Sequence, residues 1–129
     1  MTTADTPLRI ELPPDPRLLR ILRLVASGVA SLGEFDLAAV EEVRVAVDEL
    51  GATLINASNG SPIELTFELV DQVLCIHGRT HVPEGAELDV DPLTDRILDV
   101  VATSHEWSTS DGVAQGRIEK APSPATVAS

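Results

Sequence analysis

The sequence predicts an α/β (α+β) two-layer sandwich, in which three helices cover one face of a mixed, mostly antiparallel five-stranded sheet. Three segments with apolar residues at spacings of three and four each follow an aspartate that can cap a helix. Five short segments have the composition of strands, and four of them are paired as two hairpins. We expect one domain over residues 8–120, with disordered ends at 1–7 and 121–129.

Composition narrows the class of partner. The chain has 129 residues, a net charge of −12, and one Trp and two Phe as its only aromatic residues. These features argue against nucleic acid as a ligand. The acidity either serves the binding of a basic protein partner or only keeps the protein soluble. The single cysteine, Cys75, lies in an apolar run and predicts a buried thiol in a reducing compartment. No membrane-length apolar run or signal peptide is present, so we expect a cytoplasmic protein.

The first strand is predicted over 8–12 and the first helix over 17–32. Arg17, Arg20 and Arg23 on this helix form the only basic cluster of the chain. They can contact an acidic ligand or partner, or form a solvated face that offsets the global acidity.

The second helix, predicted over 35–59, has two faces. One is apolar and consists of Leu37, Val40, Val43, Val47, Leu50 and Leu54. The other is largely polar and consists of Glu42, Ala46, Glu49, Thr53 and Asn56. The polar face is either solvated or borders a site beside the sheet.

The second half of the chain predicts a hairpin of strands at 63–69 and 73–77, a loop at 78–90, a helix from 92 to near 104, and a hairpin of strands at 106–109 and 113–119. Leu93, Ile97, Val100 and Val101 give the third helix its apolar face. The loop is long enough to be functional. His77 and His81, with His105, Asp89 and Asp91, match no established metal-ligand spacing, so we expect ordinary loop and strand-end residues.

The order of these elements, together with VAVDELGATLINA on the second helix, resembles the anti-sigma-factor serine kinases of the GHKL (Bergerat-fold, histidine kinase-like ATPase) superfamily, in their actinobacterial form. The resemblance covers roughly residues 8–120, is most specific over 43–56, and includes the closing HEWSTSDGVAQGRIEK segment. It implies a Bergerat-like fold and a role in the regulation of transcription.

In the resembled family, a Glu on this helix activates a hydroxyl and an Asn one turn later ligates the magnesium of ATP. Glu49 matches the Glu and is catalytic if the chain is a kinase. Thr53 stands where the Asn is expected, and Asn56 lies on the same side nearly two turns from Glu49. Thr53 or Asn56 would therefore ligate magnesium if ATP binds.

The glycine motifs of the family are degenerate here. Of the expected Asp-x-Gly-x-Gly element, only Gly78 remains, with His77 or its neighbour in place of the Asp. The phosphate-binding Gly-x-Gly is replaced by a segment that carries Asp91 and Asp95, whose charges would repel phosphates. Gly116 matches the last glycine of the pattern. We therefore expect weak or no ATP binding, with Gly78 and Gly116 as the remaining candidate nucleotide contacts.

The resemblance implies an anti-sigma-factor-like protein that binds a sigma factor, an anti-anti-sigma antagonist, or both, with Arg17, Arg20 and Arg23 as contacts. The alternative is an active ATP-dependent serine kinase that phosphorylates an anti-anti-sigma factor through Glu49, with magnesium at Thr53 or Asn56. A third hypothesis is a module that binds only a second copy of itself, through the sheet or the first helix.

Overall fold

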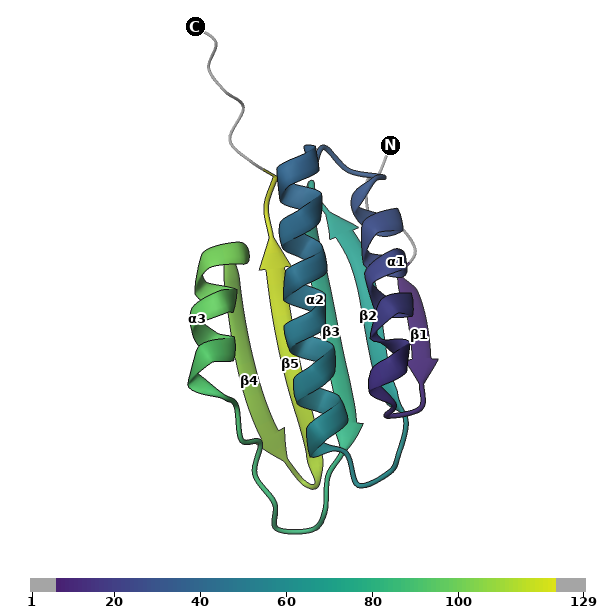
Figure 1. The fold of residues 1–129 in the computed structure, drawn as a ribbon, viewed down its shortest axis with the longest axis vertical. Coiled ribbons are helices and arrows are strands. Elements are labelled where there is room, and N and C mark those ends of the chain that lie inside the picture. Colours follow the sequence, from purple (N-terminus) through teal and green to yellow (C-terminus); the bar gives the residue numbers. More distant parts are fainter. Residues whose placement is uncertain (1–6, 123–129) are drawn as a thin grey trace, which may run out of the picture.

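The computed structural model describes residues 7–122 and contains three α-helices and five strands (Figure 1). Along the chain the elements are β1 (Leu8–Leu12), a 3-10 turn η1 (Pro16–Leu18), α1 (Leu19–Ala30), α2 (Leu37–Ala57), β2 (Ile63–Val70), β3 (Val73–His81), α3 (Pro92–Val101), β4 (Ser104–Ser110) and β5 (Val113–Lys120). The predicted order of elements is confirmed. Of the ends expected to be disordered, 1–7 and 121–129, residues 1–6 and 123–129 lie outside the described residues, and residues 7, 121 and 122 belong to no helix or strand.

The strands form one open sheet in the order β1-β2-β3-β5-β4. Every neighbouring pair within residues 7–122 is antiparallel, so the expectation of a mixed sheet was wrong. β3 and β4 run in the same direction, but β5 lies between them and pairs with both. The two predicted hairpins are confirmed, and the first turns at Asp71 and Gln72, both with positive φ as a two-residue hairpin turn requires.

Aspartate side chains start the helices as predicted. Asp36 accepts a 2.8 Å hydrogen bond from the Ala39 amide at the start of α2. Asp15 accepts a 2.9 Å bond from the Arg17 amide, but the turn it caps is 3-10, so α1 begins at Leu19 and the prediction of a helix from residue 17 was wrong. A short 3-10 turn is common where a proline opens a helix, because its tighter bonds close the first turn.

Strand β3 is longer than the sequence pattern predicted. Residues 78–81 were expected in a loop, but they continue the ladder to β5, where Gly78 faces Gly116 and Thr80 faces Ala114. The buried hydroxyl of Thr80 also donates a 3.1 Å hydrogen bond to the Pro62 carbonyl. The glycine and polar residues therefore hid a strand, and the loop to α3 spans only residues 82–91.

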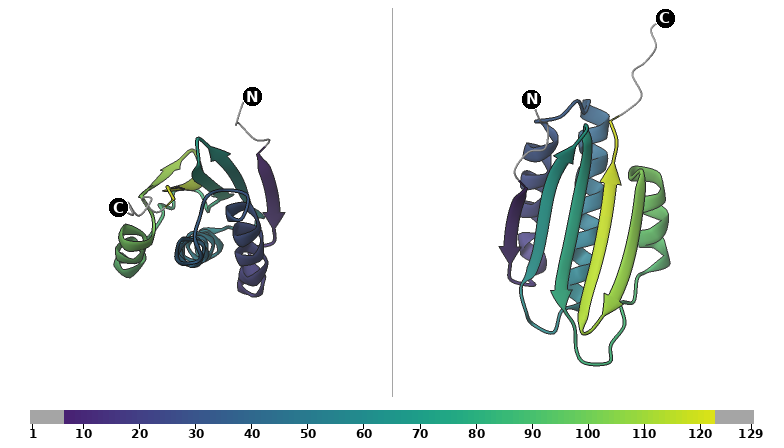
Figure 2. Two further views of the ribbon diagram at one scale, coloured as in Figure 1. Left: turned by 90° about the horizontal axis from the view of Figure 1, so that it is seen from above. Right: turned by 180° about the vertical axis from the view of Figure 1, so that it is seen from behind.

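The core lies between the three helices and one face of the sheet (Figure 1, and Figure 2 left). α2 runs over its middle, with α1 and α3 on either side. The largest fully buried side chains come from all layers and include Leu22, Val43, Val47, Leu50, Leu54, Leu65, Phe67, Ile76, Leu98 and Ile118. Burying each contributes about 1.5–3 kcal/mol, which makes this layer the main source of stability.

The third helix is rotated relative to its predicted face. Leu93 and Val100 are 58% and 76% exposed, whereas Thr94 and Leu98 are buried. The rotation has a polar cause. Thr94 donates a hydrogen bond to α2, and Asp95 accepts hydrogen bonds from β4, so these residues face the protein.

The other face of the sheet carries no helix of the described chain (Figure 2, right). Cys75 lies there between Glu68 and Glu119, and is partly exposed rather than buried as expected. Partial burial and then the Glu119 charge raise the pKa of its thiol, which keeps it protonated. None of the described helices combines the length and apolar character that a bilayer-spanning segment needs.

Candidate functional site

Glu49 lies at the boundary between α2 and α3. Its Oε1 accepts a 2.8 Å hydrogen bond from the Thr94 hydroxyl, and the Thr94 side chain is buried. Glu49 makes no ion pair with a described Lys or Arg, so a half-buried carboxylate is held in place by a neutral donor. The structure thus places the sequence-predicted glutamate beside α3 and engages one of its oxygens.

Thr53 and Asn56, two further polar residues of the predicted face, have different surroundings. Thr53 is buried one turn after Glu49, and its hydroxyl donates a 2.8 Å hydrogen bond to the Glu49 carbonyl within the helix. Asn56 is exposed on the outside of α2. The helix brings Glu49 and Thr53 within one turn of each other, whereas Asn56 lies about 10 Å further along the axis from Glu49 and is exposed there.

Gly78 and Gly116 are directly paired on β3 and β5, underneath α2. A Cβ at Gly78 would lie 2.6 Å from a Leu54 methyl, and a Cβ at Gly116 would lie 2.6 Å from Leu50 and 2.7 Å from the Trp107 ring. Both glycines therefore provide room for side chains of the protein itself. The space above this part of the sheet is filled by two leucines of α2 and by Trp107.

The N-terminus of α3 carries its own anion. Asp91 Oδ1 accepts a 2.8 Å hydrogen bond from the Leu93 amide, and the Asp91 carbonyl accepts one from the Thr94 amide. Amides at a helix start are the usual donors to a bound phosphate. Here an external anion would have to displace the Asp91 carboxylate and meet its charge.

Asp95 was expected beside Asp91 as a second charge facing phosphates, but it faces β4. Its Oδ1 accepts hydrogen bonds of 3.0 Å from both His105 Nε2 and Trp107 Nε1. His105 Nδ1 is 3.7 Å from Asp99, so the imidazole lies between two carboxylates of α3. This cluster attaches α3 to the edge of the sheet.

A partly buried cation connects the other end of α3 to α2. Lys120 Nζ, on a side chain only 12% exposed, donates to Glu42 Oε1 at 2.7 Å and to the Val101 carbonyl at 2.8 Å. A lysine at a helix C-terminus stabilises the last carbonyls. The sequence analysis missed Lys120, because no local pattern relates residues 78 positions apart.

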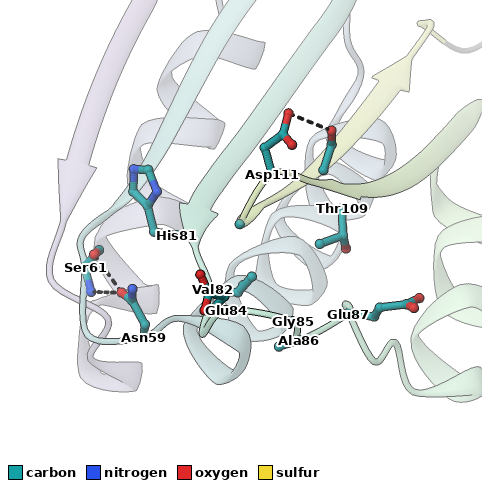
Figure 3. Close-up of a pocket in the computed structure, with 12 residues that line it drawn as sticks. Asn59, Ser61, His81, Val82, Glu84, Gly85, Ala86, Glu87, Thr109 and Asp111 are labelled. Atoms are coloured by element: carbon teal, nitrogen blue, oxygen red, sulfur yellow. Dashed lines mark hydrogen bonds between the residues drawn. The ribbon is translucent and has the colours of Figure 1, made fainter.

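A cavity of about 960 Å³ lies at the ends of α2 and β3, between the first part of the loop 82–91 and the β4–β5 turn (Figure 3). Its charged lining consists of Glu84, Glu87 and Asp111, with His81 beside them and no Lys or Arg. The other polar lining side chains are short ones, those of Asn59, Ser61, Thr109 and Ser110. Carboxylates disfavour a phosphate-bearing ligand at this end of the molecule.

The three arginines of the basic cluster have different surroundings. Arg17 pairs with Asp15 at 2.7 Å, and Arg23 pairs with Asp48 at 3.2 Å. Arg20 is exposed and forms no ion pair within residues 7–122. Burial raises the pKa of Asp48 in spite of the attraction of Arg23. Of the three, Arg20 is the residue whose charge is free for an external contact.

The three histidines lie at three separate places in the structure. His77 is 2.7 Å from the Gln115 amide oxygen on the uncovered face of the sheet, His81 lines the cavity, and His105 binds α3. In the described part of the chain, no group of three or more His, Cys, Asp or Glu residues could hold a metal ion.

No protein-family model matches the sequence, and no curated protein emerges as a relative. A functional assignment has to rest on the residues and their geometry.

Proposed function

We propose that this chain is an anti-sigma-factor-like regulatory protein of Bergerat-like fold, which binds a sigma factor, an anti-anti-sigma antagonist, or both, with weak or no ATP binding. The observation that supports this most is the engagement of the expected nucleotide-site residues within the protein itself. Glu49 is bonded to Thr94, and Asp91 occupies the amide donors at the start of α3.

These groups do not fit a magnesium-bound triphosphate. Such a ligand requires free amide or cationic donors for its phosphates and oxygen ligands for the metal. The surface over Gly78 and Gly116 is occupied by Leu50, Leu54 and Trp107. The carboxylate lining of the nearby cavity adds repulsion.

The exposed side of α1 supports a protein-binding role. Leu24 is 71% exposed and Ile21 is 38% exposed, and Arg20 projects beside them without an ion pair in the described residues. Apolar side chains around an arginine form the kind of surface in which binding energy concentrates at protein interfaces. We propose that this α1 surface contacts the partner protein. The alternative hypothesis is a homodimer that forms through α1 or through the uncovered face of the sheet.

The second candidate is an ATP-dependent serine kinase. It is favoured by one observation, the Glu49 carboxylate, which is half-buried, faces α3 and has no cationic partner among the described residues. Such a carboxylate suits a general base. This role would require α3 to move, so that Thr94 releases the oxygen it now binds.

The binding proposal is tested with purified sigma factors and anti-anti-sigma antagonists from the source genome, assayed one by one by biolayer interferometry. We expect one of them to bind, and Arg20→Glu to weaken that binding about tenfold, or about 1.4 kcal/mol. The control is Arg96→Glu, the same charge change on the exposed side of α3. Failure of every sigma factor and antagonist to bind, or equal losses in the two variants, would contradict the proposal.

A further inference from the structure

The turn between α2 and β2 contains the dipeptide Asn59-Gly60, and both residues are exposed to solvent. The backbone nitrogen that follows an asparagine can attack the side-chain carbonyl carbon of that asparagine and close a five-membered succinimide ring. Glycine leaves this nitrogen unshielded, because it has no Cβ. Gly60 has a φ of 107°, and apart from its chain neighbours no heavy atom lies within 4 Å of the place where a Cβ would stand. The attacking nitrogen is therefore sterically accessible.

Two donors of Ser61 bind the carbonyl oxygen of the Asn59 side chain (Figure 3). The Ser61 amide donates to Oδ1 at 3.0 Å, and the Ser61 hydroxyl donates to the same oxygen at 2.7 Å. Attack at Cγ places negative charge on this oxygen. Hydrogen bonds to an oxygen that gains charge are stronger in the transition state than in the ground state. The two donors are thus placed as an oxyanion hole for ring closure.

The attacking nitrogen also has a hydrogen-bond partner. The Gly60 amide donates to the Ser58 hydroxyl at 3.0 Å, and that hydroxyl donates to the Ser61 carbonyl at 2.7 Å. The amide proton has to leave as the new bond forms, and the Ser58 oxygen already binds this proton and can pass it on to water. One turn therefore combines the nucleophile, an acceptor for its proton and the donors for the developing charge.

The second asparagine of the chain, Asn56, lacks these features. It is also exposed, but it lies inside α2 and is followed by Ala57, the last residue of the helix. A helical amide points along the axis toward the carbonyl four residues earlier, so the Ala57 nitrogen is not available to attack the Asn56 side chain. Asn56 is therefore an internal reference for an exposed asparagine without the geometry of the turn.

We infer that Asn59 is a site of spontaneous deamidation that the turn itself promotes. The Gly60 nitrogen bonds to Asn59 Cγ, the bond from Cγ to the side-chain nitrogen breaks, and this nitrogen leaves as ammonia with the proton that Gly60 gives up through water. A water molecule then opens the succinimide at one of its two carbonyls, which gives aspartate or isoaspartate. No atom is oxidised or reduced. The inference goes beyond the proposed function, because no partner protein enters the reaction.

The products change the cavity at this end of the molecule. Asn59 lines the cavity together with the carboxylates of Glu84, Glu87 and Asp111, and its backbone amide donates to the His81 carbonyl at 2.9 Å. Conversion to aspartate adds a fourth carboxylate to the lining, which increases the repulsion of anions. Isoaspartate also inserts one additional carbon atom into the backbone between α2 and β2.

The test follows the folded full chain in mildly alkaline buffer. Peptide mapping by mass spectrometry detects the mass increase that replacement of the amide NH₂ by OH produces, and isoaspartyl methyltransferase quantifies isoaspartate. We expect conversion at Asn59 and none at Asn56 over the same period. The same chain unfolded in urea lacks the turn and gives the rate of the sequence alone. The folded chain should react about tenfold faster, since two hydrogen bonds that strengthen with charge lower the barrier by about 1.4 kcal/mol.

Matched variants separate the contributions of the turn. Ser61→Ala removes the hydroxyl donor and should slow conversion about fivefold, which corresponds to about 1 kcal/mol. Ser110→Ala removes an exposed hydroxyl that lines the same cavity and should leave the rate unchanged. Gly60→Ala shields the nitrogen and should abolish conversion. Circular dichroism and the melting temperature check that each variant is folded.

Four results would overturn the inference. The first is an unmodified Asn59 in the folded chain, and the second is conversion of Asn56 as fast as that of Asn59. The third is a folded-state rate no higher than the rate in urea, which would show that the turn protects Asn59. The fourth is an equal rate in Ser61→Ala, Ser110→Ala and the parent, which would remove the role of the Ser61 hydroxyl.

Discussion

The Thr94 hydroxyl donates a 2.8 Å hydrogen bond to the Glu49 carboxylate, and this bond connects α3 to the central helix. It engages the residue that the sequence marks as a candidate base, and it sets the rotation of α3 that exposes Leu93 and Val100. This one hydrogen bond therefore affects both the availability of Glu49 to a nucleotide and the side of α3 that faces solvent.

Replacing Thr94 with Val should destabilise the protein by about 1–3 kcal/mol, because the half-buried Glu49 carboxylate loses its donor. Urea unfolding measures this loss. Thr66→Val, on the uncovered face of the sheet, is the control and should change stability by less than about 0.5 kcal/mol. Equal effects at the two threonines would show that the Glu49–Thr94 bond contributes nothing specific.

Lys120→Met should lower the free energy of unfolding by about 3 kcal/mol, because Glu42 and the Val101 carbonyl lose their shared cation in a partly buried position. Arg44→Met removes a cation from the exposed pair with Glu41 and should cost at most about 0.5 kcal/mol. The two free energies of unfolding are compared in the same urea series. A Lys120 effect as small as that of Arg44 would contradict the role of Lys120 in attaching α3.

Gly116→Ala and Gly28→Ala should change stability in opposite directions. An added methyl at Gly116 meets Leu50 and Trp107, and we expect a loss of about 1–3 kcal/mol from overpacking. Gly28 lies in α1 with no heavy atom within 4 Å of the new methyl, and a gain of about 0.5–1 kcal/mol is expected from helix propensity. Thermal melts measure the direction of the stability change in both variants. Tolerance of alanine at Gly116 would show that open space, rather than packed side chains, lies above it.

The ionisation of Asp48 should make the free energy of unfolding depend on pH. Burial raises its pKa in the folded protein above the ordinary value of 3.8, against the opposing effect of Arg23. Its contribution to stability is therefore complete below pH 3.8 and is lost as the pH rises through the folded-state pKa. Asp48→Asn should gain stability relative to the parent across that window and then level off. Urea unfolding between pH 3 and pH 8 measures the difference in stability between Asp48→Asn and the parent. A stability gain of the variant that shrinks as the pH rises would contradict the raised pKa of Asp48.

The sequence was sufficient for the order of the elements, because apolar spacing and aspartate caps are local signals. It was insufficient where long-range polar contacts decide. Leu93 and Val100 have the spacing of a buried face, but the bonds of Thr94 and Asp95 turn that face outward. Residues 78–81 look like a loop, yet ladder pairing with β5 makes them a strand.

The candidate site was predictable to a similar extent. Helical spacing was enough to place Glu49 and Thr53 together, but it put Asn56 on the same face, where the structure has it exposed. The engagement of Glu49 by Thr94 depends on residues 45 positions apart, so no local pattern contains it.

The most direct test of the account is a calorimetric titration of the purified protein with ATP, in the presence and absence of Mg²⁺. If the residues around Glu49 support the fold and do not hold a triphosphate, no binding heat should appear up to millimolar ATP. Magnesium-dependent binding in the micromolar range, abolished by Glu49→Gln, would contradict the account and favour the serine kinase.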